Sequence, residues 1–567
     1  MKAAAHLLAI LLLLGISIFG VKDLFKKGYY TSHDGEGHVI RMDEFYQALK
    51  DGNVPVRWSK RLYYGYGYPF FNFNYPSVYY LGVPVMAIGF DATAAMKTVT
   101  IATFFLSGIL MYLYLRKKLR ISYAFLGSVL YLYAPYRMLN MYVRGSVAES
   151  MAFIFPPLLL FAAEAIAEQK KKAVLWGALL IAFLGISHNI SALLLFGFFF
   201  LYLLFLSVGK KSFSPLLRGS FSFSLGLCMA AFFFVPALAE KKLTFLDATI
   251  ARDYPDHFIQ LQQLLKGGWD FGGSVKGPED GLSFNIGWVQ AALAGFSLLL
   301  LFLKKKKNKH SFSLWNSTFL FSVALMAISI FFMLPVSKFF WDSLPLLPFV
   351  QFPWRFLLLT VPAISIMAAH GVQYSFSFLR GRFRNFSLIF IVGLVFLTVF
   401  LAKDQWFINQ QLFPQVREGD ALEGTTTWAD EQATRWFWPK PKEVPKEKVE
   451  ILGSGTVELE KWTTIRHSYK LVLEQQSKIV ENTMYYPGWK LRINGKPAEI
   501  SFSDERFPGR IVYELGPGSY QIMTSLGETP MRLAMDMLSF VTFVVVIVML
   551  IVPGGHTSST KKKARNS

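Results

Sequence analysis

The sequence predicts a polytopic α-helical membrane protein of about 12 transmembrane helices with a C-terminal extracytoplasmic antiparallel β-sandwich. Of the 567 residues, 53% are hydrophobic and 16% aromatic, but only 17% are charged. A soluble chain of this length would carry more charge. The apolar residues come in blocks long enough to cross a bilayer. From about residue 448 the pattern changes to short alternating segments, which are typical of strands.

Twelve apolar blocks are predicted to be spans. The block at 77–90 is shorter, and we interpret it as a re-entrant or interfacial element. Residues 1–20 lack a convincing cleavage site, so we interpret them as a retained first span. The predicted spans are 4–20, 97–115, 121–134, 151–167, 173–187, 190–208, 220–239, 285–303, 314–334, 354–373, 386–402 and 532–552.

The formal charge of +21 indicates topology rather than nucleic-acid binding. The basic residues form short clusters between the apolar blocks, and such clusters stay in the cytoplasm because lysine and arginine resist translocation. With a cytoplasmic N-terminus, every cluster and the C-terminus fall inside. The clusters are 116–120, 169–172, 210–211, 304–307, 380–384 and 561–565. The single cysteine, Cys228, excludes an internal disulfide.

This arrangement predicts four domains. Residues 1–402 form the transmembrane domain, with external loops at 21–96 and 240–284. Residues 403–447, rich in tryptophan and proline, form a linker that lies partly on the bilayer surface. Residues 448–531 form the β-sandwich, with turns predicted at Asn494-Gly495 and at 516–518. Residues 532–567 supply the last helix and a basic cytoplasmic tail.

The first external loop concentrates titratable groups where the chain leaves the bilayer. Asp34 and Glu36 precede a predicted helix that ends near Gly52, and His38 and Arg41 share one face of its first turn. A helix N-terminus favours anions. A carboxylate beside phosphate-binding groups at a membrane suggests transfer from a lipid-phosphate donor, with Asp34 as general base. The alternative interpretation is a capped loop with solvated charges.

Charged residues recur at the same predicted depth in other loops. Residues 134–150 contain Arg137, Arg144 and Glu149, His188 lies between two spans, and Arg355 begins the span near 354. Such residues are costly near a membrane unless they are paired or functional. Aromatic residues interleaved with glycine and asparagine at 63–75 would suit a sugar ring or a prenyl chain. The candidates there are Tyr64, Tyr66, Tyr68 and Phe71.

The sequence resembles a known family at these motifs. The stretches "HDGEGHVIRMDEFYQALKDGNVPVRW", "GYGYPFFNFNYP", "YAPYR" and "YVRGSVAES" resemble the multi-span GT-C glycosyltransferases. Within them they are most similar to the bacterial and archaeal membrane proteins labelled "6-pyruvoyl-tetrahydropterin synthase-related". The stretch "YYPGWKLRINGKPAEI" resembles the β-domain of related proteins implicated in glycosylating cell-envelope polymers. The sequence has no soluble domain with a three-histidine zinc site that would justify the synthase label.

The resemblance implies a GT-C-like fold and transfer of a sugar from a polyprenyl-phosphate donor to an extracytoplasmic acceptor. Asp34-Gly35-Glu36 matches a variant of the family's acidic motif, with Asp34 as base and Glu36 as helper or metal ligand. Some family members need a divalent metal such as Mg²⁺ or Mn²⁺, for which Asp34, Glu36 and His38 are the candidate ligands. The donor-phosphate candidates are Arg41, Arg144 and Arg355, and the supporting candidates are His33, His38, Glu149 and His188.

Two alternatives belong to other functional classes. A transporter or flippase of lipid-linked sugars would show internal repeats and polar sites near the bilayer midplane, and no repeat is seen in this sequence. A non-catalytic protein that binds envelope glycans is the other. In every case we expect a multi-pass protein of the plasma membrane with both termini cytoplasmic and its site on the outer face. The sugar, the acceptor, the lipid length, inversion versus retention and the oligomeric state stay open.

Overall fold

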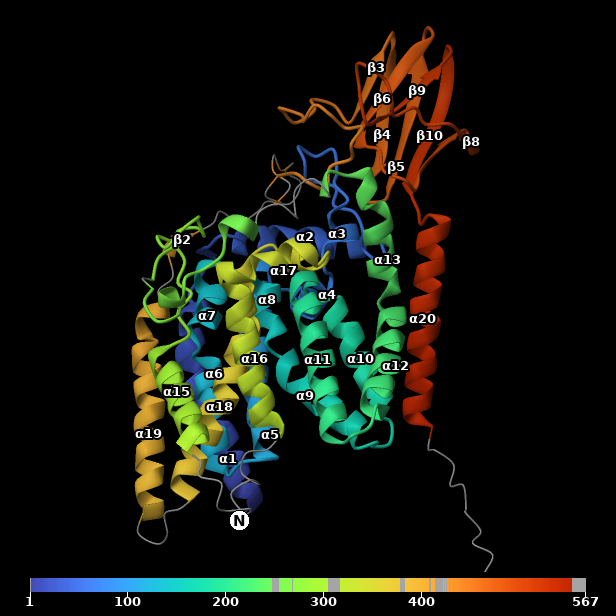
Figure 1. The fold of residues 1–567 in the computed structure, drawn as a ribbon. Helices are drawn as coiled ribbons and strands as arrows, with labels where there is room; N and C mark the ends of the chain where they lie inside the picture. Colours follow the sequence, from blue (N-terminus) through green and yellow to red (C-terminus); the bar gives the residue numbers. More distant parts are fainter. Residues whose placement is uncertain are drawn as a thin grey trace, which may run out of the picture.

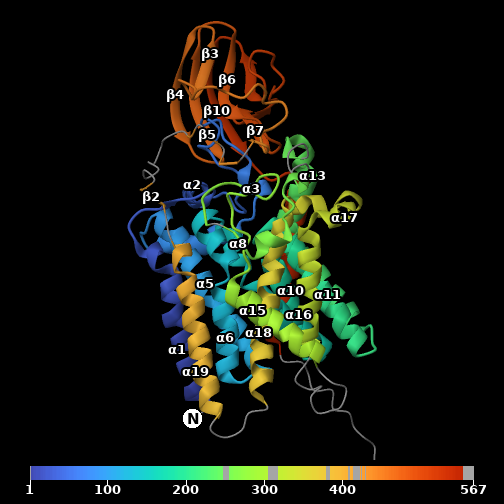
Figure 2. The same ribbon diagram turned by 60° about the vertical axis from the view of Figure 1, so that its left-hand side comes forward.

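The computed structural model describes residues 2–246, 254–267, 269–303, 317–377, 383–406, 409–412, 422, 424, 426–427 and 429–552. A long bundle of helices carries a β-sandwich at one end (Figure 1). Figure 2 shows the same two parts after a turn of 60°. The fold is therefore a polytopic helical membrane domain followed by an antiparallel β-domain, as the sequence predicts.

Every predicted span contains a helix. Seven helices of the described chain are long and apolar enough to cross a membrane, or up to nine if each of two bent pairs counts as one span. α6, α10 and α15 are shorter, with 12, 13 and 16 residues, so twelve crossings remain a prediction. The helices are α1 (Lys2–Val21), α5 (Ala92–Arg116), α6 (Ile121–Leu132), α9 (Phe155–Ala167), α10 (Ala173–Gly185), α11 (Asn189–Gly209), α12 (Ser214–Met229), α13 (Ala231–Glu240), α15 (Trp288–Leu303), α16 (Ser317–Met333), α18 (Leu357–Ser377), α19 (Phe383–Leu401) and α20 (Pro530–Ile551).

The two ends of the bundle differ as the charge pattern predicts. The N-terminus and the connections α5–α6, α9–α10 and α11–α12 lie at the end away from the sandwich (Figure 1). The basic clusters at 116–120, 169–172 and 210–211 occupy these connections. The clusters at 304–307 and 561–565, and residues 380–382 of the cluster at 380–384, lie outside the described residues.

The sandwich end carries the short elements of the external loops. α2 (Gly35–Lys50) and α3 (Phe70–Phe73) come from the first loop, and α8 (Val147–Ala152) and α17 (Lys338–Ser343) from later ones. α4 (Ser77–Ala87) has only 11 residues, with Pro84 inside it. That length fits a helix that does not cross the membrane by itself.

The β-domain consists of two antiparallel sheets. One has the order β4-β5-β10-β7-β8 and the other β3-β6-β9. Apolar side chains from both sheets form one buried core, among them Leu471 and Ile479. Asn494 and Gly495 have φ values of 49° and 78°, which confirms the predicted type I′ turn. The strands are β3 (Val449–Leu452), β4 (Gly455–Trp462), β5 (Arg466–Leu473), β6 (Ser477–Met484), β7 (Trp489–Ile493), β8 (Lys496–Ala498), β9 (Arg510–Leu515) and β10 (Gly518–Leu526).

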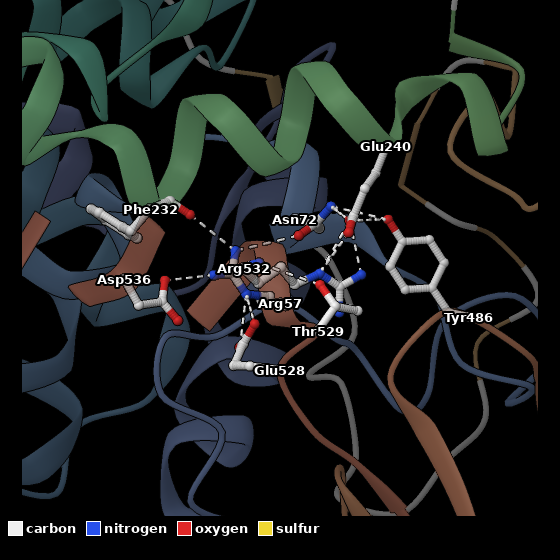
Figure 3. A network of polar contacts seen from close by, with 9 residues as sticks. All are labelled: Arg57, Asn72, Phe232, Glu240, Tyr486, Glu528, Thr529, Arg532 and Asp536. Carbon is white, nitrogen blue, oxygen red and sulfur yellow. Dashed lines mark hydrogen bonds and ion pairs between the residues drawn. The ribbon is translucent and has the colours of Figure 1, made fainter. Parts of the chain in front are cut away.

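A buried polar network fastens the sandwich to the bundle (Figure 3). Arg57 of the first loop pairs with Glu528 and with Asp536 of α20, both at 2.8 Å.

A second cluster surrounds Glu240 of α13, which pairs with Arg532 of α20 at 2.8 Å. The hydroxyl of Tyr486 and the amide of Asn72 also donate to Glu240. The side chains that make these contacts come from four segments far apart in the chain.

The predicted linker is folded onto the first external loop. β2 (Asn409–Leu412) pairs with β1 (Tyr30–Thr31). The amide of Tyr64 donates to the carbonyl of Leu422 at 2.7 Å. Trp436 packs against Tyr485 of the sandwich, with ring centroids 6.1 Å apart. Trp428, another linker tryptophan, lies outside the described residues.

Candidate functional site

Asp34 stands at the N-terminus of α2, as the sequence predicts, and its side chain is exposed. The backbone before the helix is held by the 134–150 loop. The amide of His33 donates to the carbonyl of Val143 at 3.0 Å, and the amide of Asp34 donates to that of Arg144 at 2.8 Å. Two loops that are more than 100 residues apart in sequence are thus joined at the acidic turn.

Gly145 makes this close approach feasible. Its φ is +60°, a left-handed conformation that favours glycine. A Cβ there would lie 2.3 Å from Ser32 Oγ and 2.7 Å from the amide nitrogen of Gly35. The glycine in the "VRGS" stretch therefore sets the distance between the acidic turn and Arg144.

Glu149 of α8 connects two of the predicted arginines. Arg144 Nη1 lies 2.7 Å from Glu149 Oε2, and Arg355 Nε lies 3.7 Å from the same oxygen. All three side chains are buried. The ring of Trp354 lies beneath both guanidinium groups, with centroid distances of 4.8 Å to Arg144 and 5.7 Å to Arg355. One carboxylate thus serves two cations, which leaves the group with positive charge in excess.

Two buried donors at this position are unsatisfied. Within the part of the chain that the structure describes, Arg355 Nε and Trp354 Nε1 have no hydrogen-bond acceptor. Buried donors are normally paired, and an unpaired one costs free energy. Both donors belong to residues that surround Glu149, so this cluster holds more donors than acceptors.

Arg41 adds a third buried cation on the side of α2. Its Nε donates to Thr426 Oγ1 at 2.9 Å, and its guanidinium lies 4.6 Å from the ring centre of Phe70. Burial opposes its charge, but the surrounding Tyr79, Tyr75 and Asp34 raise the pKa of Arg41 above its usual value. The guanidinium therefore remains charged.

The supporting histidines have separate roles. His38 is buried with Nδ1 3.0 Å from the Tyr79 hydroxyl, and burial holds its pKa well below the usual value. His188 Nδ1 accepts from the amide of Ser191 and caps α11, as its position suggests. Burial lowers the pKa of His188 to about 3, despite the opposing charge of Glu149. Both rings are consequently neutral. His33 is exposed, with Nε2 2.9 Å from the carbonyl of Phe271.

Glu36 lies in the first turn of α2, where Oε1 accepts weakly from the amide of Ser32 at 3.4 Å. Partial burial, with the nearby charge of Asp34, raises its pKa. Metal binding would require Asp34, Glu36 and His38 to converge. Among the described residues no group of three or more histidine, cysteine or acidic side chains is arranged to hold a metal ion. These described residues therefore do not fit a resident cation.

Arg137 and the aromatic candidates of the first loop do not belong to the cluster around Glu149. Arg137 points into the bundle, where it donates to Ser107 Oγ at 2.7 Å and contacts three aromatic rings. The aromatic set is not an open platform, because Tyr66, Tyr68 and Phe71 are buried and only Tyr64 is partly exposed. Tyr66 packs on Phe437 of the linker, for example, with ring centroids 5.2 Å apart.

The structure adds site residues that the sequence reasoning missed. Tyr136 donates to Glu149, Asn140 accepts from Arg144, and the ring of Tyr75 packs edge-on against His188 at 5.0 Å. Trp354, whose ring contacts both Arg144 and Arg355, is the fourth residue that was not predicted. Tyr136 and Asn140 stand in the same "APYRMLN" stretch as Arg137 and a few residues before Arg144, so their polarity next to an apolar block was the available signal.

Three comparisons place the chain among known proteins. Residues 71–403 match the family described as "6-pyruvoyl-tetrahydropterin synthase related domain; membrane protein". An uncharacterized protein of Lactococcus lactis subsp. cremoris (strain MG1363) is 22% identical over 341 residues, which cover 57% of this chain and 53% of the relative. The chain thus spans about half the length of this curated relative. The crystal structure of the Archaeoglobus fulgidus oligosaccharyltransferase in the apo form is 13% identical with a TM-score of 0.37, over 71% of this chain and 56% of that one.

Proposed function

This chain belongs to the 6-pyruvoyl-tetrahydropterin synthase-related family of membrane proteins, and from this premise we propose that it is a membrane glycosyltransferase. The donor is a sugar linked to a polyprenyl phosphate, and the acceptor is extracytoplasmic. The site lies at the sandwich end of the bundle, which faces the outside of the plasma membrane. Both termini are cytoplasmic.

One observation carries the proposal: an exposed carboxylate stands beside buried cations that share too few counter-ions. Asp34 is joined through the backbone to Arg144, and its negative charge acts on Arg41 and Arg355 as well. A general base must reach solvent and substrate, whereas phosphate-binding cations gain strength from burial. This division between the groups fits group transfer from a lipid phosphate.

In the proposed reaction, an acceptor hydroxyl attacks the anomeric carbon of the donor sugar. Asp34 takes the hydroxyl proton as the new carbon–oxygen bond forms. The bond between the anomeric carbon and the phosphate oxygen breaks, and the phosphate leaves with the electron pair. Arg144 and Arg355, fixed by Glu149, stabilise the charge on the leaving phosphate. Direct displacement of this kind inverts the anomeric configuration.

Arg41 lies on α2, about two helical turns beyond Asp34. There it can bind a further phosphate oxygen, since a guanidinium recognises phosphate with two parallel donors. The neutral rings of His38 and His188 pack close by without adding positive charge. His38 positions Tyr79, and His188 positions the start of α11.

The test compares purified wild type with Asp34→Asn and Asp91→Asn in detergent. Asp91 is an exposed residue that caps α5, and asparagine caps equally well, so this exchange is a matched control. A panel of radiolabelled polyprenyl-phosphate sugars is supplied with membrane-glycan acceptors, with and without chelator. Loss of sugar from the lipid in wild type and Asp91→Asn, but not in Asp34→Asn, supports the assignment. Near-normal turnover in Asp34→Asn rules it out.

Detergent also separates the transferase from a flippase, because a solubilised protein has no compartments between which to move a lipid. Turnover that resists the chelator would agree with the absence of a converging metal-ligand set among the described residues. Turnover that the chelator abolishes would require a metal carried by the substrate phosphate.

A further inference from the structure

A hollow of about 650 Å³ opens beside the candidate site at the outer end of the bundle. Three segments line it: the end of the first span, the external loop near 270 and the start of the linker. The lining residues are Lys22, Asp23, Trp269, Asp270, Phe271, Lys403 and Asp404.

The hollow adjoins the acidic turn. His33, the residue before Asp34, lies with Nε2 2.9 Å from the carbonyl of Phe271 in the hollow's wall. On another side, the strand pair β1–β2 ties Tyr30 to Leu412, shortly after Lys403 and Asp404. A molecule in this hollow would therefore lie next to the proposed base.

The lining combines aromatic rings with donors and acceptors of hydrogen bonds. Trp269 is partly exposed, yet its indole N–H is buried and lacks an acceptor within the described chain. Asp404, another lining residue, is exposed. Asp270 uses Oδ1 to accept from the amide of Phe271 at 2.7 Å, which leaves its other oxygen for a ligand. Sugars need this combination, because hydroxyl groups both donate and accept and the ring faces pack on aromatic side chains.

Other ligand classes fit less well. An acyl or prenyl chain would need aliphatic walls, and the seven lining residues include no aliphatic apolar side chain. A polyanion would face three carboxylates against two ammonium groups, and the like charges would repel it. A neutral molecule that carries many hydroxyl groups needs no aliphatic walls and is not repelled by the carboxylates.

We propose that this hollow binds a neutral glycan, and that this glycan is the acceptor of the transfer. The second part rests on the proposed function, whereas the binding itself does not. The partly exposed ring of Trp269 packs on a sugar face, Asp270 and Asp404 accept from sugar hydroxyls, and the terminal residue of the glycan reaches towards Asp34.

The test measures binding without turnover. Saturation-transfer NMR in detergent would follow maltohexaose, cellohexaose, chitohexaose and mannohexaose, with a glycerol-phosphate hexamer as the anionic comparator. The proteins are wild type, Asp34→Asn, Trp269→Ala and Trp438→Ala. Trp438 is 63% exposed and packs on Phe245 rather than in the hollow, so its truncation is the matched control.

We expect at least one neutral hexasaccharide to bind wild type, Asp34→Asn and Trp438→Ala alike, and to bind Trp269→Ala about tenfold more weakly. No binding by any neutral hexasaccharide, equal binding by Trp269→Ala and Trp438→Ala, or binding of the glycerol-phosphate hexamer alone would each overturn the proposal. Because Asp34→Asn should bind normally, loss of transfer in that variant and loss of glycan binding remain separate results.

Discussion

Arg532 at the start of α20 and Glu240 at the end of α13 form a buried two-pronged ion pair, with Nε–Oε1 at 2.9 Å and Nη2–Oε2 at 2.8 Å. The hydroxyl of Tyr486, from the sandwich, donates to the same carboxylate at 2.8 Å. One side chain therefore holds together a helix of the bundle, the last helix and the β-domain.

Replacing Glu240 with glutamine should destabilise the protein strongly, because it leaves the buried charge of Arg532 unpaired. Breaking a buried pair costs about 3–5 kcal/mol. Asp342→Asn is the control, since its ion pair with Lys338 is exposed and such pairs contribute about 0–1 kcal/mol. Thermal unfolding in detergent measures both. Equal melting temperatures for the two variants would contradict the role given to Glu240.

Replacing Gly145 with alanine should reduce sugar transfer far more than it reduces stability. The added Cβ would force the 32–35 turn away from the 143–145 loop, and the left-handed backbone adds a cost of about 1 kcal/mol or more. A displacement of this kind can lower turnover about 100-fold. Gly197→Ala is the control, because nothing lies within 4 Å of the built Cβ. The two variants are compared by donor turnover and melting temperature, and normal turnover in Gly145→Ala would refute the prediction.

Replacing Arg137 and replacing Arg144 with methionine should have different effects on the stability of the protein. Arg144→Met removes the closer of the two cations that contact Glu149, leaves it with Arg355 at 3.7 Å, and should lower the melting temperature. Arg137 has no carboxylate partner among the described residues, and its Nη1 is unsatisfied. Arg137→Met removes a buried, uncompensated cation and should leave the melting temperature unchanged or raise it. A large loss of stability in Arg137→Met would point to a counter-ion for that cation.

Acidification should destabilise the protein, and the titration of His188 should contribute to the dependence of stability on pH. Its pKa is about 3 in the folded protein and about 6.5 in an unfolded chain. Between these values the unfolded chain binds the proton and the folded one does not, so stability falls as the pH drops below about 6.5. His188→Asn keeps a capping residue at α11 but removes this titration. Its melting temperature should therefore fall less steeply from pH 7 to pH 5 than that of wild type, although His38 titrates in the same sense. Identical slopes would exclude His188 as a contributor.

Local signals in the sequence predicted the elements of the fold well. The positive φ values of Asn494 and Gly495 and the helix start next to Asp34 depend on neighbouring residues alone. Each apolar block located at least one helix of the bundle because length and hydropathy identify such blocks, but the bend of 73° that divides the block at 220–239 into α12 and α13 was not predicted. Family membership was likewise predicted from short motifs.

Contacts between distant segments could not be predicted in the same way. Arg41 binds Thr426, 385 residues away, and no pattern within either segment indicates this pairing. The burial of Tyr66 and Tyr68 under the linker follows from the same folding of distant parts. The sequence nominated Arg144 and Arg355 as phosphate-binding candidates, and the structure adds that both contact Glu149 whereas Arg137 donates to Ser107.

The junction in Figure 3 has a consequence for biosynthesis. Arg57 and Glu528 are 471 residues apart, so the ribosome must add 471 residues after Arg57 before this pair can form. Until residues 528–536 are made, Arg57 and Glu240 lack their ion-pair partners Glu528, Asp536 and Arg532. A nascent chain that stops before residue 528 would therefore carry two charges without their ion-pair partners, a state that membrane quality-control proteases could distinguish from the chain in which both pairs are formed.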